Sequence, residues 1–264
     1  MLALLATAAG VSRPVVAQSS ACQSASAAAH LDHVAIAVRD LASASSLFRD
    51  TLGFSLKPGS LHGNGLSNVH VRFADGSALE LITAGQGEPD GLSEWYRRFL
   101  AEGDGGAFVA LRAGPPDSVL DRLGELAAEA LVFEGPAFDW VSFPEGHPLH
   151  PIFFVHVREH PVDMPGHLRH ANGATGLSEV WLESLDLRIL AVLLGRFGAE
   201  PCGEVEGLQG LSGIGYGLAG STLVAVPMET AEKEPRVPAV ILRGDRSLPY
   251  VLSTGVWMGW VEGP

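Results

Sequence analysis

The feature that most constrains the fold of this chain is an order of predicted elements: a strand, a helix and three strands, starting at residue 31. Residues 31–38 (LDHVAIAV) are an apolar, partly β-branched run that is typical of a strand. Asp40 is a suitable N-cap for the next segment, where apolar residues recur at helical spacing until Gly53 ends the helix. Three short strands are then predicted, at residues 54–57, 68–73 and 78–82.

The same order of elements recurs twice along the chain, although few residues are repeated. The second pass has a strand at 107–111, a helix at 117–128 and strands at 131–133, 138–143 and 152–157. The third pass has a strand at 176–184, a helix at 186–197 and weaker strands at 213–218, 221–226 and 239–242. An additional helix is predicted at about 92–102, between the first two passes. The sequence therefore predicts an α+β fold built from repeated βαβββ modules, with a third module after the first two.

These passes divide the chain into three parts. Residues 1–30 form a signal-like or disordered segment, residues 31–175 hold the paired modules, and residues 176–264 hold a third βαβββ-like module and a C-terminal tail. A lone third module would leave a sheet edge or face unsatisfied. We therefore expect it to pack against the first two modules or against a second chain in a homodimer.

The first thirty residues differ in composition from the rest. Residues 1–11 are small and apolar, an Ala- and Ser-rich stretch follows, and no acidic residue precedes Asp32. Residues 15–17 (VVA) resemble a signal cleavage site, but no Lys or Arg precedes the apolar stretch. A secretory signal, an organellar transit peptide and a disordered tail all fit this pattern. A signal would make the protein periplasmic or secreted, and otherwise we expect it to be cytoplasmic.

Charge and cysteine content exclude several classes of function. The chain has 17 Lys and Arg residues against 30 Asp and Glu residues, a formal net charge of -13, so we expect no nucleic-acid partner. No stretch after the N-terminal segment is long and apolar enough to span a membrane. Cys22 and Cys202 lack the spacing of a zinc site or a disulfide framework. One bridge between them is conceivable, but Cys22 belongs to a segment that we expect to be removed or loose.

Several short motifs resemble those of a known superfamily. The motifs are LDHV at residues 31–34, a Gly-rich loop with Gly63 and Gly65 leading to Asn68, LELI at 79–82, HPLHPIFF at 147–154 and HANGA at 170–174. Together they resemble the glyoxalase/bleomycin-resistance/extradiol-dioxygenase superfamily, also called vicinal oxygen chelate, and most closely its glyoxalase-like domain group. The loop usually reads Gly-Thr before its Asn, whereas Leu66 and Ser67 stand here. The resemblance covers roughly residues 31–194 and implies a curled mixed sheet around one small-molecule site.

The resemblance also implies metal ligands on the first and last strands of each module. His33 and Glu80 occupy these positions in the first module, and His156 occupies the last strand of the second. The remaining position falls on Gly106, which has no side chain. Two imidazoles and one carboxylate suit a divalent metal (Fe, Mn, Ni or Zn) with open positions for substrate oxygens.

Further site residues follow from the same resemblance. It implies that Asn68 and Asn172 contact the substrate, and that Glu80 and His170 take part in catalysis.

Each of these candidate site residues has a simpler interpretation. Glu80 alternates with two leucines, which also fits a solvent-exposed face, and a shift of one residue in the strand register would turn His156 away from the site. Six of the ten histidines lie between residues 147 and 170, where the many prolines indicate loops, and solvated side chains are common in loops.

Two functions from different classes fit these residues. The first is a divalent-metal-dependent lyase, isomerase or dioxygenase that acts on a small oxygenated metabolite. The second is a metal-free protein that binds or sequesters a small molecule, as resistance-type relatives do. His33 and Glu80 favour the enzyme, whereas Gly106 favours the binding protein.

Overall fold

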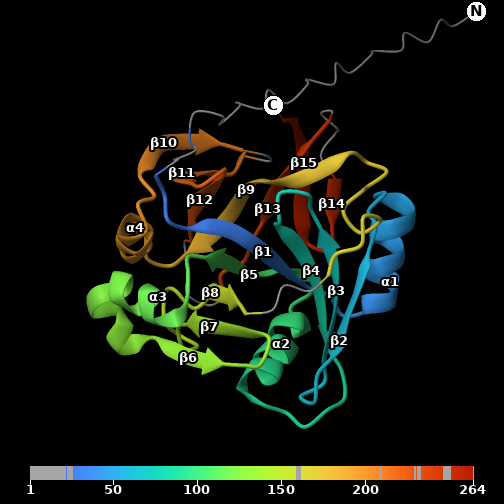
Figure 1. Cartoon of the computed structure of the whole chain (residues 1–264), viewed down its shortest axis with the longest axis horizontal. Coiled ribbons are helices and arrows are strands. Elements are labelled where there is room, and N and C mark those ends of the chain that lie inside the picture. The colour runs from blue at the N-terminus through green and yellow to red at the C-terminus, as the bar shows by residue number, and fades with distance from the viewer. Residues whose placement is uncertain are drawn as a thin grey trace, which may run out of the picture.

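The chain forms two mixed β-sheets, which the computed structural model describes over residues 22, 26–158, 162–207, 210–228, 230, 233–245 and 251–263 (Figure 1). Most of the N-terminal segment, residues 1–21 and 23–25, lies outside the described residues. The predicted α+β class and the βαβββ modules of the first sheet are confirmed, and that sheet is curled into a half-barrel.

The first sheet contains two modules in the strand order β2-β3-β4-β1-β5-β8-β7-β6. The first module consists of β1 (His30–Ala37), α1 (Leu41–Ser46) with a π-helical continuation (Leu47–Thr51), β2 (Lys57–Leu61), β3 (Leu66–Arg72) and β4 (Ala78–Ala84). The second consists of β5 (Gly105–Arg112), α3 (Pro116–Leu123) with a 3-10 continuation (Gly124–Glu129), β6 (Leu131–Glu134), β7 (Phe138–Ser142) and β8 (Ile152–Val157). Strand β1 is parallel to β4 and antiparallel to β5, so the two modules join along their first strands.

The first short strand after α1 lies later than the sequence predicts. It was expected at 54–57, but Phe54 is buried in the core and the strand runs over Lys57–Leu61. Pro58 and Gly59 are residue types that are uncommon in strands, so the sequence does not indicate this strand. Its pairing with β3 shifts register between Pro58 and Leu61. Strand β2 is an edge strand, where a proline leaves no hydrogen bond of the ladder unmade.

The second sheet has the strand order β10-β11-β12-β9-β13-β15-β14. Its first half consists of β9 (Ala174–Ser184), α4 (Leu187–Arg196), β10 (Pro201–Glu206), β11 (Ser212–Leu218) and β12 (Ser221–Pro227), and its second half of β13 (Ala239–Gly244), β14 (Val251–Ser253) and β15 (Val256–Glu262). Strand β13 is antiparallel to β9 and parallel to β15, as β5 is to β1 and β8. The C-terminal strands thus repeat the order of a second module in shortened form and pair with the edge of β9.

This arrangement differs from the predicted third module with a tail. The sequence assigns residues 239–242 to the last strand of the third module because it misses β10. Strand β10 contains Pro201 and Gly203 and is exposed along most of its length, so it lacks an apolar alternation. With β10 counted, β13 starts a fourth, partial module.

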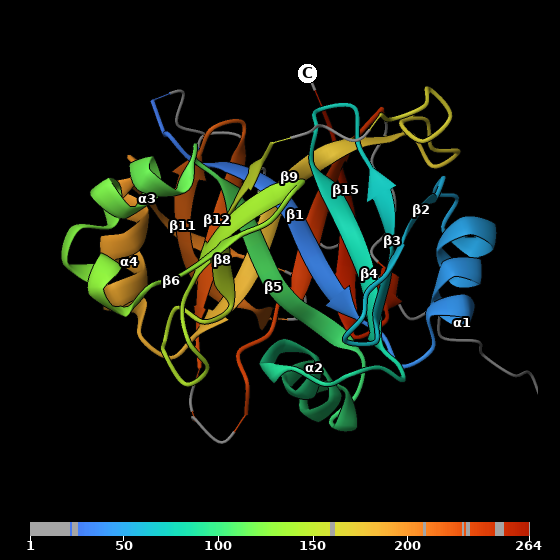
Figure 2. The same ribbon diagram turned by 60° about the horizontal axis from the view of Figure 1, so that its bottom comes forward.

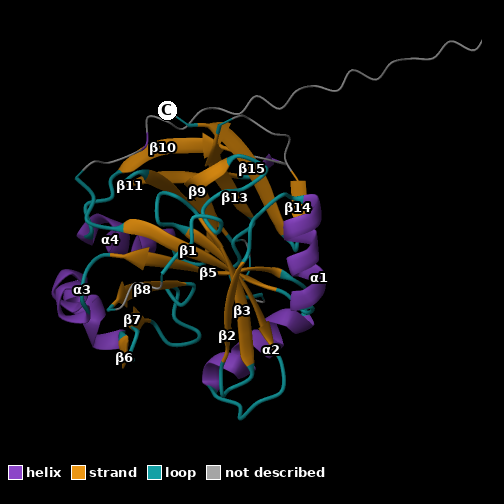
Figure 3. Ribbon diagram, turned by 45° about the vertical axis from the view of Figure 1, so that its right-hand side comes forward, coloured by secondary structure: helices purple, strands orange, loops and turns teal. Residues whose placement is uncertain are grey.

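The main core lies between the two sheets (Figures 2 and 3). Ile36 and Leu81 from the first sheet pack in one buried cluster with Val180 and Leu223 from the second. The π-helical continuation of α1 and helices α3 and α4 add buried side chains to the same cluster, namely Phe48, Leu123 and Leu193. Each such side chain contributes about 1.5–3 kcal/mol when it is fully removed from water. The central strands β1, β4, β9 and β12 therefore turn alternate residues to this layer and the residues between them to the opposite face.

Helix α2 (Gly91–Ala101) confirms the additional helix predicted between the first two modules. It begins with a capping box, in which Asp90 and Ser93 bond each other's backbone N–H groups. Its Trp95, Tyr96 and Phe99 pack in a second cluster on the face of the first sheet that points away from the second sheet. We call this surface of the first sheet the α2 face.

Cys22 and Cys202 form a disulfide, with Cα atoms 5.5 Å apart. Cys22 is buried and bonded to the second sheet, so this residue is not loose. The bridge ties residue 22 to strand β10 of the second sheet.

Among the described residues, no helix is long and apolar enough to cross a membrane.

Candidate functional site

Strand alternation places several polar side chains on the α2 face. Val34, Leu81 and Val71 belong to the core between the sheets, so their neighbours His33, Glu80 and His70 point the other way. The registers of β1 with β4 and of β3 with β4 bring these three side chains into one region, and His70 lies directly opposite Glu80. His70, Glu80 and His33 thus lie side by side on the α2 face, on the adjacent strands β3, β4 and β1.

Glu80 is the centre of this group. Its Oε2 lies 3.5 Å from Nε2 of His33, and its Oε1 accepts a hydrogen bond from Nδ2 of Asn68 at 2.5 Å. Asn68 is fixed in turn, because its Oδ1 accepts from the backbone N–H of Ser60 at 2.8 Å. The Glu80 side chain is only 13% exposed. The simpler interpretation of Glu80 as a solvated surface carboxylate is therefore wrong.

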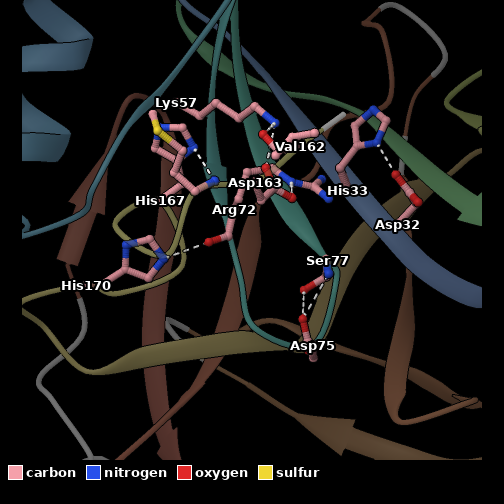
Figure 4. A network of polar contacts seen from close by, with 11 residues as sticks. Asp32, His33, Lys57, Arg72, Asp75, Ser77, Val162, Asp163, His167 and His170 are labelled. Atoms are coloured by element: carbon pink, nitrogen blue, oxygen red, sulfur yellow. Dashed lines mark hydrogen bonds and ion pairs between the residues drawn. The ribbon is translucent and has the colours of Figure 1, made fainter. Parts of the chain in front are cut away.

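Asp32 supports His33 from the other side of the ring (Figure 4). Its Oδ1 lies 2.8 Å from Nδ1 of His33, and its Oδ2 lies 3.6 Å from Nε of Arg112. Adjacent strand residues normally point to opposite faces, but the pairing of β1 with β5 shifts register between Leu31 and His33. This irregularity lets the two neighbouring side chains meet. Asp32 was not predicted as a site residue, although the Asp-His pair was part of the resemblance.

The charges around His33 favour its protonated form. Burial alone lowers the pKa of His33, but the hydrogen bond that its Nδ1 donates to Asp32 and the negative charges of Asp32 and Glu80 outweigh burial, so the pKa is raised. Burial raises the pKa of Asp32, but the bond to His33 and the charges of His33 and Arg112 leave it below its ordinary value. The site therefore places the His33 ring between two carboxylates, which favour its protonated form.

His70 is a site residue that the sequence reasoning missed. It lies opposite Glu80, yet its pKa is lowered, because burial and the charges of His33, Arg72 and Lys57 outweigh the charge of Glu80. The available signal was the alternation of Asn68, His70 and Arg72 with two valines in β3, which predicts one polar face. The α2 face thus holds one imidazole with a raised pKa and one with a lowered pKa.

Aromatic side chains form the other half of the α2 face. The His33 ring contacts the ring of Phe153 edge-on, with centroids 5.5 Å apart, and Phe108 packs against Trp95 and Tyr96 of α2. Burial and the charge of Glu80 hold the pKa of Tyr96 well above its ordinary value, so its hydroxyl stays protonated. The arrangement combines a charged imidazole–carboxylate pair with an apolar, aromatic wall. Such a surface suits a small ligand that has both oxygen atoms and an apolar ring or chain.

Comparison with known proteins places the chain in a family. The sequence model of a family described as glyoxalase-like domain matches residues 31–195, more than half of the chain. The chain belongs to the glyoxalase-like domain family. A search of curated protein sequences finds no match.

Solved structures share the fold of this glyoxalase-like domain protein at low identity. A hypothetical protein from Staphylococcus aureus aligns with 12% identity and a TM-score of 0.65, over 89% of this chain and 99% of that one. A mutant of 4-hydroxymandelate synthase from Streptomyces coelicolor aligns with 19% identity and a TM-score of 0.59, over 83% and 71%. A variant of homoprotocatechuate 2,3-dioxygenase from B. fuscum aligns with 13% identity and a TM-score of 0.55, over 87% and 70%. These solved structures show the fold, and the family match over residues 31–195 confirms the predicted glyoxalase-like domain group.

The two metal-ligand positions of the second module do not join His33 and Glu80. A Cβ atom at Gly106 would lie 2.5 Å from Cβ of Val237, which is held there by a hydrogen bond to the Gly106 carbonyl. On β8, Phe153 points to the α2 face and contacts His33, whereas Phe154 points into the core. His156 is two residues after Phe154 and lies on the core side. The predicted ligand His156 is therefore on the wrong face of the sheet.

His170 and Asn172 have structural roles away from the α2 face. Both ring nitrogens of His170 are used: Nδ1 accepts from the N–H of Ser55 at 3.0 Å, and Nε2 donates to the carbonyl of Arg72 at 3.0 Å. Asn172 donates to the carbonyl of Leu52 and accepts from the N–H of Ala174. These residues join the segment before β9 to the first module. The predicted catalytic role of His170 and the substrate contact of Asn172 thus have no support in this geometry.

The residues at the predicted ligand positions do not fit the metal centre that the resemblance implies. Within the described residues, no group of three His, Cys, Asp or Glu side chains is close enough to hold a metal ion. His33 and Glu80 supply two donors, but the third position is closed at Gly106 and His156 faces the core. Glu80 is also already bonded to Asn68. We therefore derive no chemical step through a metal.

Proposed function

We propose that this glyoxalase-like domain protein binds a small oxygenated molecule on the α2 face without a metal held by three side chains. The observation that carries this proposal is the direct pairing of His33 with Glu80 beside a third ligand position that has no room for a side chain. The pair supplies a proton donor and a proton acceptor, and Phe108 and Phe153 supply apolar contact. We expect a ligand with hydroxyl or carbonyl oxygens next to an apolar or aromatic group.

The chemistry of the pair also defines how the ligand would be held. The raised pKa of His33 favours the ring that donates through Nε2, and the Glu80 carboxylate, 3.5 Å away, is the acceptor. Asp32 holds the His33 ring in place, and Asn68 holds the carboxylate. A ligand hydroxyl next to a carbonyl or second hydroxyl would satisfy both groups. In a partly buried site, such charge-assisted hydrogen bonds are stronger than neutral ones.

A metal-dependent lyase, isomerase or dioxygenase is the second candidate. It is favoured by the distance of 3.5 Å between Nε2 of His33 and Oε2 of Glu80, since an imidazole and a carboxylate this close can share one ion with water or substrate oxygens. The fold of the similar solved structures agrees with both candidates.

Metal analysis of the purified full chain separates the two candidates. The protein is incubated in turn with Fe(II), Mn(II), Ni(II) and Zn(II), dialysed, and assayed for bound metal. Our proposal predicts far less than one metal per chain in every case. One tightly held metal per chain that is lost in a folded His33→Ala/Glu80→Ala variant, and retained in the exposed control Glu94→Gln, would establish the metal-dependent candidate instead.

We also propose that the protein works in an oxidising compartment, after export. The support is the Cys22–Cys202 disulfide, since such bridges persist outside the reducing cytosol. Residue 22 follows the small-residue stretch at 15–17, so cleavage there would keep Cys22 in the mature chain. Cell fractionation and intact-mass measurement of the native protein test this. A cytosolic protein with two free thiols and an uncleaved N-terminus would contradict it.

A further inference from the structure

A cavity of about 290 Å³ lies between the two sheets, away from the α2 face. The ends of β1 and β5 line it from the first sheet, and β9, β13 and the turn between β11 and β12 line it from the second. Its polar lining includes Arg112, Arg243, Asp75, Ser77 and Ser221. The His33–Glu80 pair is not part of this lining.

Two arginines from different sheets meet at this cavity, next to the turn between β3 and β4. Nη1 of Arg243 lies 3.4 Å from Oδ2 of Asp75 in that turn. A Cβ atom placed on the next residue, Gly76, would lie 3.6 Å from Nη2 of Arg112. Two guanidinium groups and the carboxylate of Asp75 thus line one cavity, and a second carboxylate, that of Asp32, lies 3.6 Å from Nε of Arg112.

The neighbouring acceptors satisfy only part of these two guanidinium groups. Each guanidinium has five N–H donors. Arg243 reaches Asp75 and the carbonyl of Gly220, and Arg112 reaches Oδ2 of Asp32 at 3.6 Å, longer than a hydrogen bond. The other oxygens of these carboxylates are in use: Oδ1 of Asp75 accepts from Ser77, and Oδ1 of Asp32 faces His33 (Figure 4). More donors than acceptors therefore surround the cavity.

Ser221 adds a further polar group. It is 3% exposed, and its hydroxyl has no hydrogen-bond partner among the described residues. A buried hydroxyl without a partner is unfavourable by about 1–3 kcal/mol, which favours a polar group within reach. Beside the carboxylate of Asp75, the lining thus offers two guanidinium groups and a hydroxyl without a partner among the described residues.

We propose that this inter-sheet cavity binds a small oxyanion, held by Arg112 and Arg243. Planar guanidinium groups bind phosphate and carboxylate oxygens through paired N–H donors. The cavity volume suits a free inorganic anion or a short carboxylic acid rather than a large ligand. The bound anion would accept from the N–H groups that Asp75, Asp32 and the Gly220 carbonyl leave without a partner, and it would join the two sheets.

Calorimetric titration of the full chain at low ionic strength tests this proposal, with inorganic phosphate and malonate as the two probes. We expect saturable binding of at least one probe, and the preferred probe identifies the anion as phosphate-like or carboxylate-like. Arg112→Gln and Arg243→Gln should each weaken binding at least about tenfold, or about 1.4 kcal/mol. Arg188→Gln is the matched control, because the Arg188 side chain is 95% exposed on α4 and should change binding less than about twofold.

A second variant covers the case in which an arginine substitution prevents folding. Ala219 lies at the edge of the cavity, so Ala219→Asp would add a tethered carboxylate and leave both arginines in place. We expect this variant to fold and to lose binding of the probe. The proposal is overturned if neither probe binds saturably, if binding survives both arginine substitutions, or if folded Ala219→Asp binds as the wild type does.

Discussion

Oε2 of Glu80 lies 3.5 Å from Nε2 of His33, across the parallel pair of strands β4 and β1. This contact depends on the alternation of buried and polar residues along both strands. Leu79 and Leu81 are fully buried between the sheets, and so are Val34 and Ile36. The polar residues between them consequently share the α2 face. Any change in the register of β1 against β4 would separate the pair.

Asn68→Ala should destabilise the protein and loosen Glu80. The substitution removes the donor to Oε1 of Glu80 and the acceptor for the N–H of Ser60. Leaving partly buried partners unpaired lowers the free energy of unfolding by about 1–3 kcal/mol. Urea denaturation followed by circular dichroism measures this. A change below about 0.5 kcal/mol would mean that water replaces Asn68 and that the residue does not position Glu80.

Gly106→Ala should also destabilise the protein, because its new Cβ atom would meet the side chain and carbonyl of Val237. We expect a loss of about 1–3 kcal/mol in unfolding free energy, typical of overpacking. Gly195→Ala is the matched control, since a Cβ at Gly195 of α4 meets nothing within 4 Å. That change should stabilise the helix by up to about 1 kcal/mol. If both variants unfold alike, the third ligand position is not closed in the way that we describe.

His170 should make stability depend on pH. Burial outweighs the bond to the Arg72 carbonyl and lowers the pKa of His170 in the folded protein. In the unfolded chain its pKa returns to about 6.5, so the unfolded state binds more protons between the two values. This contribution to stability is present above about pH 6.5 and is lost as the pH falls below it.

The substitution His170→Gln isolates this effect. The variant should be less stable than the wild type near pH 7, because it loses hydrogen bonds, but its stability should fall less steeply between about pH 7 and pH 5. Urea denaturation at several pH values gives both slopes. Parallel slopes for the two proteins would show that His170 does not titrate differently in the folded state.

Removing the disulfide by Cys22→Ser/Cys202→Ser should destabilise the chain by about 2–5 kcal/mol. The bridge spans a sequence separation of 180 residues, so its loss increases the freedom of the unfolded chain. Reduction of the wild type should have the same effect, and the variant should not respond to reductant. Equal unfolding curves for oxidised and reduced wild type would contradict a stabilising bridge.

Much of the fold can be predicted from the sequence, because its strongest signals are local. The apolar run around His33 and the alternating LEL motif around Glu80 are clear strand signals, and both strands lie where they were expected. Edge strands carry weaker signals. Strands β2 and β10 contain Pro58 and Pro201, and both are largely exposed, so neither shows an apolar pattern.

The candidate site was predicted only in part, for reasons of register and hydrogen bonding. Strand β8 (IFFVHV) is apolar on both faces, so its pattern does not show which way His156 points. The Asn172-Gly173 turn marks a bend but does not reveal that His170 is bonded to the first module through Arg72. Asp32 joins the site only through an irregular pairing between β1 and β5, which no sequence pattern indicates.

Titration of EDTA-treated full-length protein with catechol tests the central claim most directly, because catechol has two adjacent hydroxyls on an aromatic ring. Phenol is the control ligand and Glu94→Gln the control variant. We predict that catechol binds without added metal, that phenol binds more weakly, and that Glu80→Gln weakens catechol binding by about tenfold or more. Catechol binding that appears only after a divalent metal is restored, or that Glu80→Gln leaves unchanged, would contradict the account.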